Sequence, residues 1–448
     1  MKEKIIKEKT ITVENKQRSF KQQAILFFLL FSCSFGYAQN NLELQKLTVI
    51  SRHGVRSPLE QYLETLDSLT GDGYHWTRWS VPGSNLTLRG GALEILHGDY
   101  FRLWLDSEGF TNGLKEQDIY FGASSKQRTV ATARAFAAGL FPLLTVPVDY
   151  KLTVDSTIGY LDPNYLPLFY TDDADGHFDT NAFKEEAKRE LGELIAPSYL
   201  YLEEILRMKS SLYAKQNGMN HFDKKVGVCL DFYDTKNGKR REPTMVGGLK
   251  IANMASDALI LKYLENDTDT IFGDSLSFDD WKKLASIKDY YSHILFSKAP
   301  IISVNVSHCM LKRVYSEMIS GGHKFAFFCT HDSMIEALLA ALRVTPYELQ
   351  GTIESKTPLG CKVLFEEWSE KDPNPKKYVR VRLVYQSSEQ IREIQRMDLE
   401  NPPMSFEFTF IGLDKAPNGM YRYDDFMNHL QKSIQAYQAT AKGENPWK

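Results

Sequence analysis

The chain has 448 residues, of which 43% are hydrophobic and 25% charged, and its formal net charge is -3. This is the composition of an ordinary globular protein with enough chain for one large domain or two. The near-neutral charge gives no reason to expect binding to nucleic acid or to an anionic membrane surface. Any acidic ligand would have to be bound by arginines that cluster locally.

The first 38 residues have the pattern of a secretory signal peptide. A cationic stretch precedes the apolar run AILFFLLFSCSFGYA, which is short for a membrane span and ends in small residues up to Ala38. We predict cleavage after Ala38 and export to the periplasm. A lipid anchor on Cys33 is the alternative, although Phe31 stands where a small residue is usual. No later segment is long and apolar enough to span a membrane.

Four cysteines remain after removal of the signal peptide, namely Cys229, Cys309, Cys329 and Cys361. An even number in an exported protein permits two disulfides, with three possible connectivities. Cys329 lies in an apolar run and also suits a buried thiol.

The first part of the mature chain alternates between strand and helix patterns. Strands are predicted at 47–50 and 118–124, and helices at 90–109 and 127–141, where apolar residues recur at helical spacing. A loop rich in tryptophan, with Trp76 and Trp79, follows the first strand. This order predicts an α/β domain with a central sheet flanked by helices.

Residues 151–299 have mostly helical patterns, as in 247–265, separated by polar turns. A strand-like run, KFAFFCT at 324–330, then returns the chain to the sheet, and alternating runs at 377–386 and 406–412 predict further strands. We therefore predict an α/β core formed by residues 39–150 and 300–448, and a mostly helical cap formed by residues 151–299.

Unusual polar residues follow the first strand. The segment RHGVRSP places Arg52, His53 and Arg56 at the carboxyl end of a strand, where α/β folds bind ligands. Guanidinium groups bind phosphate oxygens in pairs, and a histidine among them can act as a nucleophile that forms phosphohistidine. Arg128, at the start of the helix at 127–141, is the expected third arginine.

His331 and Asp332 follow the later strand. Ser333 and Glu336 have capping-box spacing, so we predict that a helix begins at Ser333. The free amides and dipole of a helix start favour an anion. Asp332 could protonate a departing oxygen, which requires it to hold a proton and predicts an acidic pH optimum.

No metal and no cofactor are predicted. The other histidines lack a metal-ligand spacing such as HExxH. The acidic stretch 171–186 resembles a calcium loop, but Thr171 and Ala182 stand at its first and last ligand positions, where carboxylates are needed. We predict a solvated acidic loop there.

The motifs RHGVRSP, QRTVATA and THDS together resemble the histidine acid phosphatases, a branch of the histidine phosphatase superfamily. The resemblance extends over essentially the whole mature chain. It implies an α/β core with a mostly helical second domain and a small phosphorylated substrate bound in the cleft between them. We predict a monomer or homodimer. The resemblance also implies roles for six residues: His53 as nucleophile, Asp332 as proton donor, and Arg52, Arg56, Arg128 and His331 as phosphate ligands.

Longer stretches, including VPGSNLTLRGGALEILHGDYFRLWL and REPTMVGGLKIANMASDALILKYLE, resemble the glucose-1-phosphatases of that family. This implies small sugar phosphates, above all glucose 1-phosphate, as substrates, and Glu242 matches a glutamate that lies near the sugar. Gly54 instead follows the broader acid phosphatase and phytase pattern, so phytate hydrolysis or broad specificity is the alternative. A periplasmic phosphosugar-binding protein without turnover is more remote, because a binding protein needs no proton donor such as Asp332.

Overall fold

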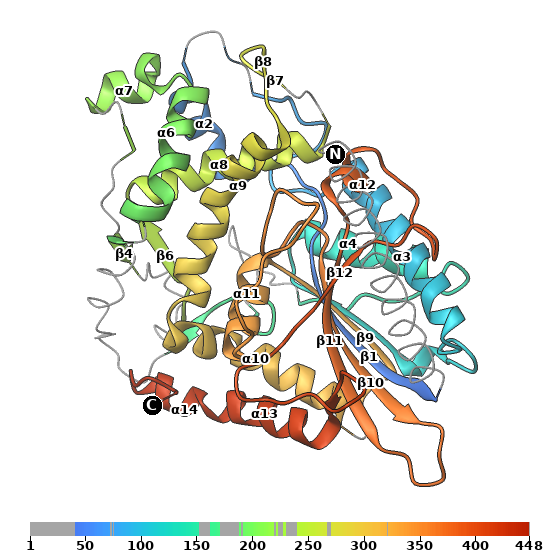
Figure 1. Ribbon diagram of the computed structural model, residues 1–448. Helices are drawn as coiled ribbons and strands as arrows, with labels where there is room; N and C mark the ends of the chain where they lie inside the picture. The colour runs from blue at the N-terminus through green and yellow to red at the C-terminus, as the bar shows by residue number, and fades with distance from the viewer. Residues whose placement is uncertain are drawn as a thin grey trace, which may run out of the picture.

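The structure is a computed structural model that describes residues 41–447 except 72–73, 75, 152–161, 171–187, 190, 219–220, 223–226, 230–239, 267–269 and 320. The predicted signal peptide and the acidic stretch at 171–186 lie outside these residues. A seven-stranded sheet forms the centre, in the order β12-β11-β10-β1-β9-β2 with β13 paired to β11 (Figure 1). Its strands are β1 (Leu42–Arg52), β2 (Ile119–Ala123), β9 (Phe325–Thr330), β10 (Lys362–Glu370), β11 (Lys377–Tyr385), β12 (Met404–Glu407) and β13 (Tyr421–Arg422).

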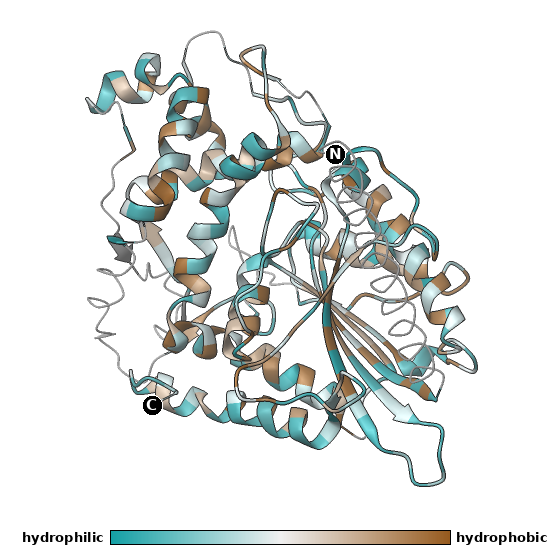
Figure 2. Ribbon diagram, viewed as in Figure 1, coloured by the Kyte–Doolittle hydropathy of each residue, from teal (hydrophilic) through white to brown (hydrophobic). Residues whose placement is uncertain are grey.

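Helices cover both faces of this sheet, as the sequence predicted. Strand β9 is buried along its whole length. Its Phe325 and Phe327 pack on the face covered by α3 (Leu88–Ser107) and α4 (Gln127–Leu140), while Ala326 and Phe328 pack on the other face. That second face is covered by α10 (Pro300–Met318), α11 (Asp332–Ala341) and α13 (Tyr423–Gln435). Hydrophobic and hydrophilic residues alternate along these helices in Figure 2, as expected where one side packs on a core.

Helices α3 and α4 touch through their backbones. A Cβ atom at Gly98 would collide with the carbonyl oxygen of Phe136, and one at Gly139 would collide with that of Ile95. Only glycine allows this approach. The contact fixes α4, whose first turn carries Arg128, against the rest of the core.

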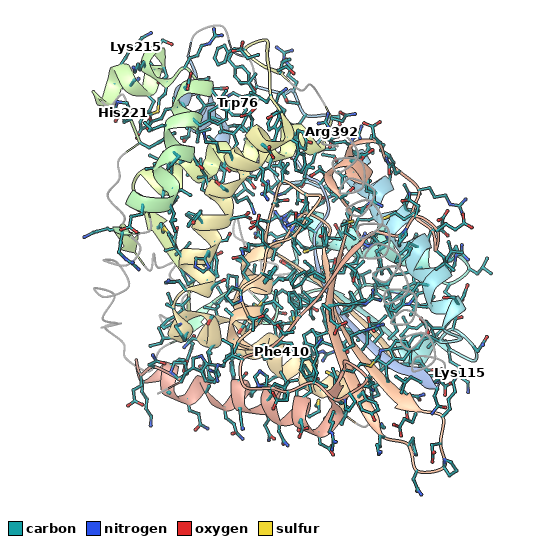
Figure 3. All side chains as sticks on the ribbon, in the orientation of Figure 1. Trp76, Lys115, Lys215, His221, Arg392 and Phe410 are labelled. Atoms are coloured by element: carbon teal, nitrogen blue, oxygen red, sulfur yellow. The ribbon has the colours of Figure 1, made fainter. Side chains whose placement is uncertain are left out.

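A mostly helical cap packs around Trp281. Its helices are α6 (Ala196–Ile205), α7 (Leu212–Asn217), α8 (Gly248–Leu264) and α9 (Phe278–Ser292), and its short strands are β3 (Phe169–Tyr170), β4 (Gly227–Cys229), β5 (Arg240–Arg241), β6 (Thr244–Val246), β7 (Thr270–Ile271) and β8 (Asp274–Ser275). Helix α2 (Leu63–Leu69) and Trp76 join the same cluster, and Trp76 Nε1 donates to the Leu66 carbonyl at 3.1 Å (Figure 3). The tryptophan loop, which precedes the predicted range of residues 151–299, therefore packs on the cap.

Helix α10 connects the cap to the core. Its Ile302 and Val306 belong to the cap cluster, whereas its Val304 and Met310 belong to the sheet cluster. The domain boundaries at 150 and 300 remain a prediction. Within the described residues, no single helix is long and apolar enough to cross a membrane. The segments Phe278–Ser297 and Pro300–Met318, which meet at a bend of 83°, reach the length and hydropathy of a membrane span only when they are taken together.

Two strands of the sheet differ from the sequence prediction. The strand expected at 406–412 ends at Glu407 in β12, and β10 was not predicted, because Glu366 and Glu367 interrupt its apolar pattern. Glu366 is fully buried, and ion pairs with Arg380 and Arg382 neutralise the charge of its carboxylate. The remaining described helices, α12 (Ser388–Arg392) and α14 (Tyr437–Ala441), are short.

Helix α11 begins at Asp332 rather than Ser333, with His331 as its N-cap residue. The predicted capping box is absent because the Glu336 carboxylate accepts a hydrogen bond from Thr357 Oγ1 at 3.1 Å instead.

The two disulfides that the cysteine count permits do not both form, because Cys329 and Cys361 are free, buried thiols. Cys329 lies in β9 and Cys361 directly precedes β10, and these strands flank β1 on opposite sides. Two strand spacings separate such positions by about 10 Å, beyond the reach of a disulfide. The two thiols also pack on opposite faces of the sheet.

Candidate active site

The carboxyl ends of three parallel strands meet at one edge of the sheet. Arg52 of β1 pairs in register with Thr330 of β9, and Ala123 of β2 pairs with Cys329. The residues that follow these strands therefore lie close together. A pocket of about 500 Å³ opens there toward the cap, and six of the seven predicted residues line it: His53, Arg56, Arg128, Glu242, His331 and Asp332.

His53 is buried, and its Nδ1 lies 2.9 Å from the carbonyl oxygen of Gly54. A carbonyl only accepts hydrogen bonds, so Nδ1 carries the proton and Nε2 of the neutral ring keeps its lone pair. Burial, together with the nearby Arg128 and Arg56, holds the pKa of His53 well below its ordinary value. The neutral form of this ring is therefore the stable one.

The backbone beside this histidine is closely packed. Gly54 N donates to Thr132 Oγ1 at 3.0 Å, and a Cβ atom at Gly54 would lie 3.1 Å from Glu94 Oε1. A larger residue at this position would require the Glu94 side chain to move.

Positive charge is concentrated in the pocket. Arg56 donates to both carboxylate oxygens of Asp257, at 3.1 and 2.9 Å, and Arg128 Nη2 lies 3.3 Å from His331 Nδ1. Burial and the neighbouring Arg56 lower the pKa of Arg128 to about 9. Among the described residues, the buried Nε atoms of Arg52, Arg56 and Arg128 have no hydrogen-bond partner. The cluster is therefore suited to an anion with several oxygens.

Arg52 does not line the pocket but lies behind it. Its Nη1 contacts Glu354 Oε1 at 2.7 Å and the carbonyl oxygen of Thr357 at 2.5 Å, and its Nη2 lies 3.1 Å from Asp332 Oδ2. Because Arg56 and Arg128 line the pocket and Arg52 does not, the geometry favours Arg56 and Arg128 for direct contact with an anion.

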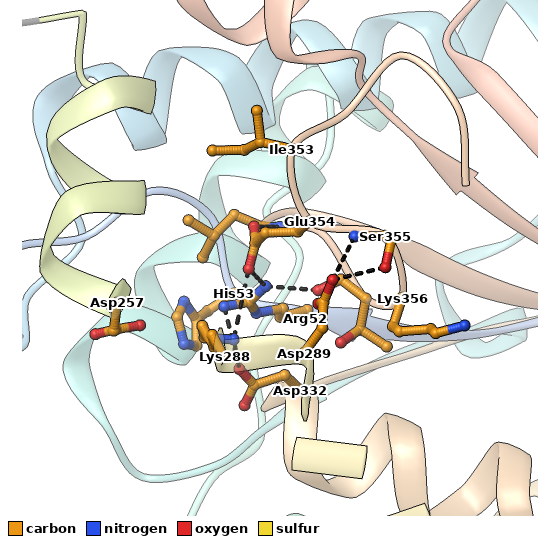
Figure 4. Close-up of polar contacts among 12 residues, drawn as sticks. Arg52, His53, Asp257, Lys288, Asp289, Asp332, Ile353, Glu354, Ser355 and Lys356 are labelled. Atoms are coloured by element: carbon orange, nitrogen blue, oxygen red, sulfur yellow. Dashed lines mark hydrogen bonds and ion pairs between the residues drawn. The ribbon is translucent and has the colours of Figure 1, made fainter. Parts of the chain in front are cut away.

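Asp332 accepts contacts on both oxygens. Oδ2 lies 2.6 Å from Lys288 Nζ, and Oδ1 accepts the backbone N–H of Ser333 at 2.9 Å (Figure 4). Burial alone would raise the pKa of Asp332, but Lys288 and Arg52 hold it well below its ordinary value. Without a ligand Asp332 is therefore a carboxylate, whereas the predicted role of proton donor requires the acid.

Glu242 faces the pocket from the cap, in the turn before β6, and is half-buried. Burial raises the pKa of its carboxyl group, an effect that Lys126 and Arg128 oppose. Lys126, the N-cap residue of α4, lines the same pocket. Glu242 and Lys126 thus flank the region of the pocket beyond the arginine cluster.

The charged residues of this site that were not predicted from the sequence include Asp257, Lys288, Glu354, Lys126 and Lys250. Lys288 lies on the buried stripe of α9, seven residues after Trp281 and four after Leu284, where an apolar residue is expected. A charge in the apolar stripe of a helix was the available signal. Within the described ranges, no group of three or more His, Cys, Asp or Glu side chains could hold a metal ion.

Comparison with known proteins shows the family to which this chain belongs. The model of the histidine phosphatase superfamily (branch 2) matches residues 43–213. A glucose-1-phosphatase of Providencia rettgeri is 31% identical over 414 residues, which cover 89% of this chain and 93% of the relative. A glucose-1-phosphatase of Salmonella typhimurium is 30% identical over 395 residues, which cover 86% and 91%. The chain belongs to this branch of the superfamily, the histidine acid phosphatases, and is a phosphatase.

A solved structure agrees with the fold. The phytase of Citrobacter braakii superposes with a TM-score of 0.74 at 23% identity, covering 87% of this chain and 97% of the phytase. The α/β sheet with a helical cap is therefore the fold of this family, as the sequence motifs implied.

Proposed function

We propose that this phosphatase hydrolyses small sugar phosphates, with glucose 1-phosphate as the preferred substrate, through a covalent intermediate on His53. One observation carries the proposal. The Nδ1 hydrogen bond to Gly54 leaves Nε2 as the nucleophilic nitrogen of His53, in a pocket shared with Arg56 and Arg128.

The reaction takes two displacements. His53 Nε2 attacks phosphorus, the bond from phosphorus to the sugar oxygen breaks, and that oxygen takes a proton from Asp332. Water then attacks the phosphorus of phosphohistidine and gives a proton to the Asp332 carboxylate. The bond from phosphorus to His53 breaks, phosphate is released, and His53 and Asp332 return to their starting states. The arginines and His331 hold the phosphate oxygens in line throughout.

Asp332 needs a proton for the first step. A phosphate dianion that binds Arg56 and Arg128 brings negative charge close to Asp332 and raises its pKa. Acid solution supplies the same proton. Activity should therefore be greatest at acidic pH and fall as the carboxyl group ionises.

The cap side of the pocket supports a sugar as the leaving group. Glu242 lines it, and so does Asn253, whose buried Oδ1 has no hydrogen-bond partner among the described residues. Both can accept hydrogen bonds from hydroxyl groups. The relatives named glucose-1-phosphatases point to the same substrate.

Phytate is the alternative substrate, because two lysines besides Lys288, namely Lys126 and Lys250, line the pocket. Their ammonium groups could bind further phosphates of an inositol ring. The ranking of glucose 1-phosphate and phytate by kcat/KM decides between the two.

The test is phosphate release from glucose 1-phosphate, phytate and p-nitrophenyl phosphate between about pH 3 and pH 8, with a chelator present. His53→Ala should lose activity by more than about a hundredfold, while His221→Ala, a change at an exposed histidine, should match the wild type. Alkaline quenching during turnover, which preserves the acid-labile bond of phosphohistidine, should leave phosphate on the wild type and none on the His53→Ala protein. Retention of more than about a hundredth of the rate by His53→Ala would reject the nucleophile.

Export is a separate part of the proposal. Removal of residues 1–38 would leave Gln39 as the first residue. Amino-terminal sequencing of the protein from the periplasm checks this directly. A lipid-modified Cys33 at the terminus would instead support the anchored form.

A further inference from the structure

We propose that Lys288 of the cap is a positioning residue that controls when Asp332 of the core holds the proton for the leaving group, and so sets the pH range of the reaction. This inference rests on the proposed function, in which Asp332 is the proton donor.

The geometry singles out Lys288. It reaches from α9 into the pocket, and its Nζ lies 2.6 Å from Asp332 Oδ2 and 3.5 Å from Glu354 Oε1 (Figure 4). Its side chain is only 8% exposed. A buried ammonium group this close to a carboxylate stabilises the ionised form strongly. Asp332 can accept a proton only if this contact is weakened or its charge is balanced by substrate.

Other charged groups around Asp332 contribute less directly. Arg52, at the end of β1, contacts the same oxygen at 3.1 Å but shares its charge with Glu354 at 2.7 Å. The titratable and charged groups that face this cluster from the surrounding elements are His53, Arg56, Arg128, Asp257, Asp289, Tyr291, His331, Glu336 and Glu354. Lys288 is the member that comes from the cap and makes the shortest contact with the Asp332 carboxylate.

Two substitutions should act in opposite directions. Lys288→Met removes the cation while keeping an unbranched side chain, so Asp332 would keep its proton to higher pH. Glu354→Gln removes the carboxylate that shares Lys288 and Arg52, so both cations would act on Asp332 alone and it would lose its proton at lower pH. Opposite shifts from two neighbouring changes cannot arise from a general loosening of the site.

The experiment measures kcat/KM against pH for glucose 1-phosphate and p-nitrophenyl phosphate in the wild type, Lys288→Met, Lys288→Arg and Glu354→Gln. The sugar oxygen needs a proton to depart, whereas p-nitrophenolate leaves without one. For glucose 1-phosphate, Lys288→Met should move the alkaline limb upward by roughly one to three pH units. Lys288→Arg should keep the wild-type limb, and Glu354→Gln should move it downward. The alkaline limb for p-nitrophenyl phosphate should stay at the same pH in all four proteins, whatever the height of each profile.

An unshifted limb in Lys288→Met, with KM raised equally for both substrates, would make Lys288 a phosphate ligand and overturn the inference. If Lys288→Met does not fold, the direction of the Glu354→Gln shift decides alone, and an upward shift or no shift overturns the inference. These outcomes differ from failure of the proposed function, in which the wild type releases no phosphate or His53→Ala remains active.

Discussion

Lys362 Nζ and Glu94 Oε2 form an ion pair of 2.9 Å that is completely enclosed behind the His53 loop, with both side chains at most 1% exposed. Lys362 Nζ also donates to the carbonyl oxygen of Gly360 at 2.8 Å, and Gly360 N donates to the carbonyl oxygen of His53 at 3.0 Å. A chain of contacts thus runs from the buried pair to the backbone of the proposed nucleophile. The pair supports the loop from the side opposite the pocket.

Removing one member of this pair should destabilise the protein strongly. Lys362→Met leaves the Glu94 charge buried without its partner, and burial already raises the pKa of that carboxyl group. We expect the free energy of unfolding to fall by about 3–5 kcal/mol, measured by urea denaturation at neutral pH. Lys282→Met, which breaks an ion pair with Glu348 at the surface, should cost less than about 1 kcal/mol. Equal losses in the two variants would contradict this account.

Asp257 should affect substrate binding through Arg56. Its carboxylate holds Arg56 from helix α8 of the cap, so Asp257→Asn leaves the guanidinium free to turn away from the phosphate. We expect kcat/KM to fall by roughly 10- to 100-fold for every phosphate ester, with KM raised. Asp274→Asn, at an exposed aspartate of the cap, is the control and should have no effect. An unchanged KM in Asp257→Asn would show that Arg56 is held in place without it.

Glu242 should affect the choice of substrate. Glu242→Gln weakens the acceptor for sugar hydroxyls, so kcat/KM for glucose 1-phosphate should fall by about tenfold or more while that for p-nitrophenyl phosphate is retained. Lys126→Met should instead reduce the rate on phytate, because it removes a cation from the same wall. A Glu242→Gln protein that loses both monoester activities equally would place Glu242 in the common chemistry rather than in selection.

His97 should make the fold sensitive to acid. It is fully buried beside Phe101 and Phe136, and neither ring nitrogen has a partner within the described residues. Burial and Lys362 hold its pKa well below the ordinary value. Below about pH 6.5 the unfolded chain binds a proton at His97 that the folded chain does not, so the free energy of unfolding decreases as the pH falls.

His97→Leu removes this titration. Urea denaturation at about pH 7 and about pH 5 should then show a smaller loss of stability in the variant, by up to about 2 kcal/mol. His53 and His331 have lowered pKa values for the same reason, so some acid sensitivity should remain. An identical loss in variant and wild type would show that His97 can be protonated in the folded state.

Local sequence patterns predicted much of this site. The strand that ends at Arg52, the strand that ends at Thr330 and the helix that carries Arg128 each have a periodicity that can be read within about ten residues. Parallel strand ends then bring His53 and Asp332 together. Short-range patterns were least reliable at element boundaries, where the start of α11 was misplaced by one residue because tertiary contacts engage Glu336.

The contacts between cap and core could not be predicted in this way. Asp257 lies 201 residues beyond Arg56, and Lys288 lies 44 residues before Asp332. No periodicity relates positions at such separations, and only the packing of α8 and α9 over the sheet edge brings them together. The sequence also contained no sign that Arg52 would be turned toward Glu354, because that carboxylate comes from a loop 302 residues away.

Two ion pairs join the cap to the core: the Asp257 carboxylate contacts Arg56, and the Lys288 ammonium group contacts Asp332. Exchanging the predicted cap, residues 151–299, between members of this family would therefore transfer two charges of the candidate site together with the wall that we propose contacts the leaving group. Substrate preference and pH response would be inherited as one unit in such chimeras. Natural or engineered changes of specificity in the cap should accordingly be accompanied by changes in the acidity at which the enzyme works.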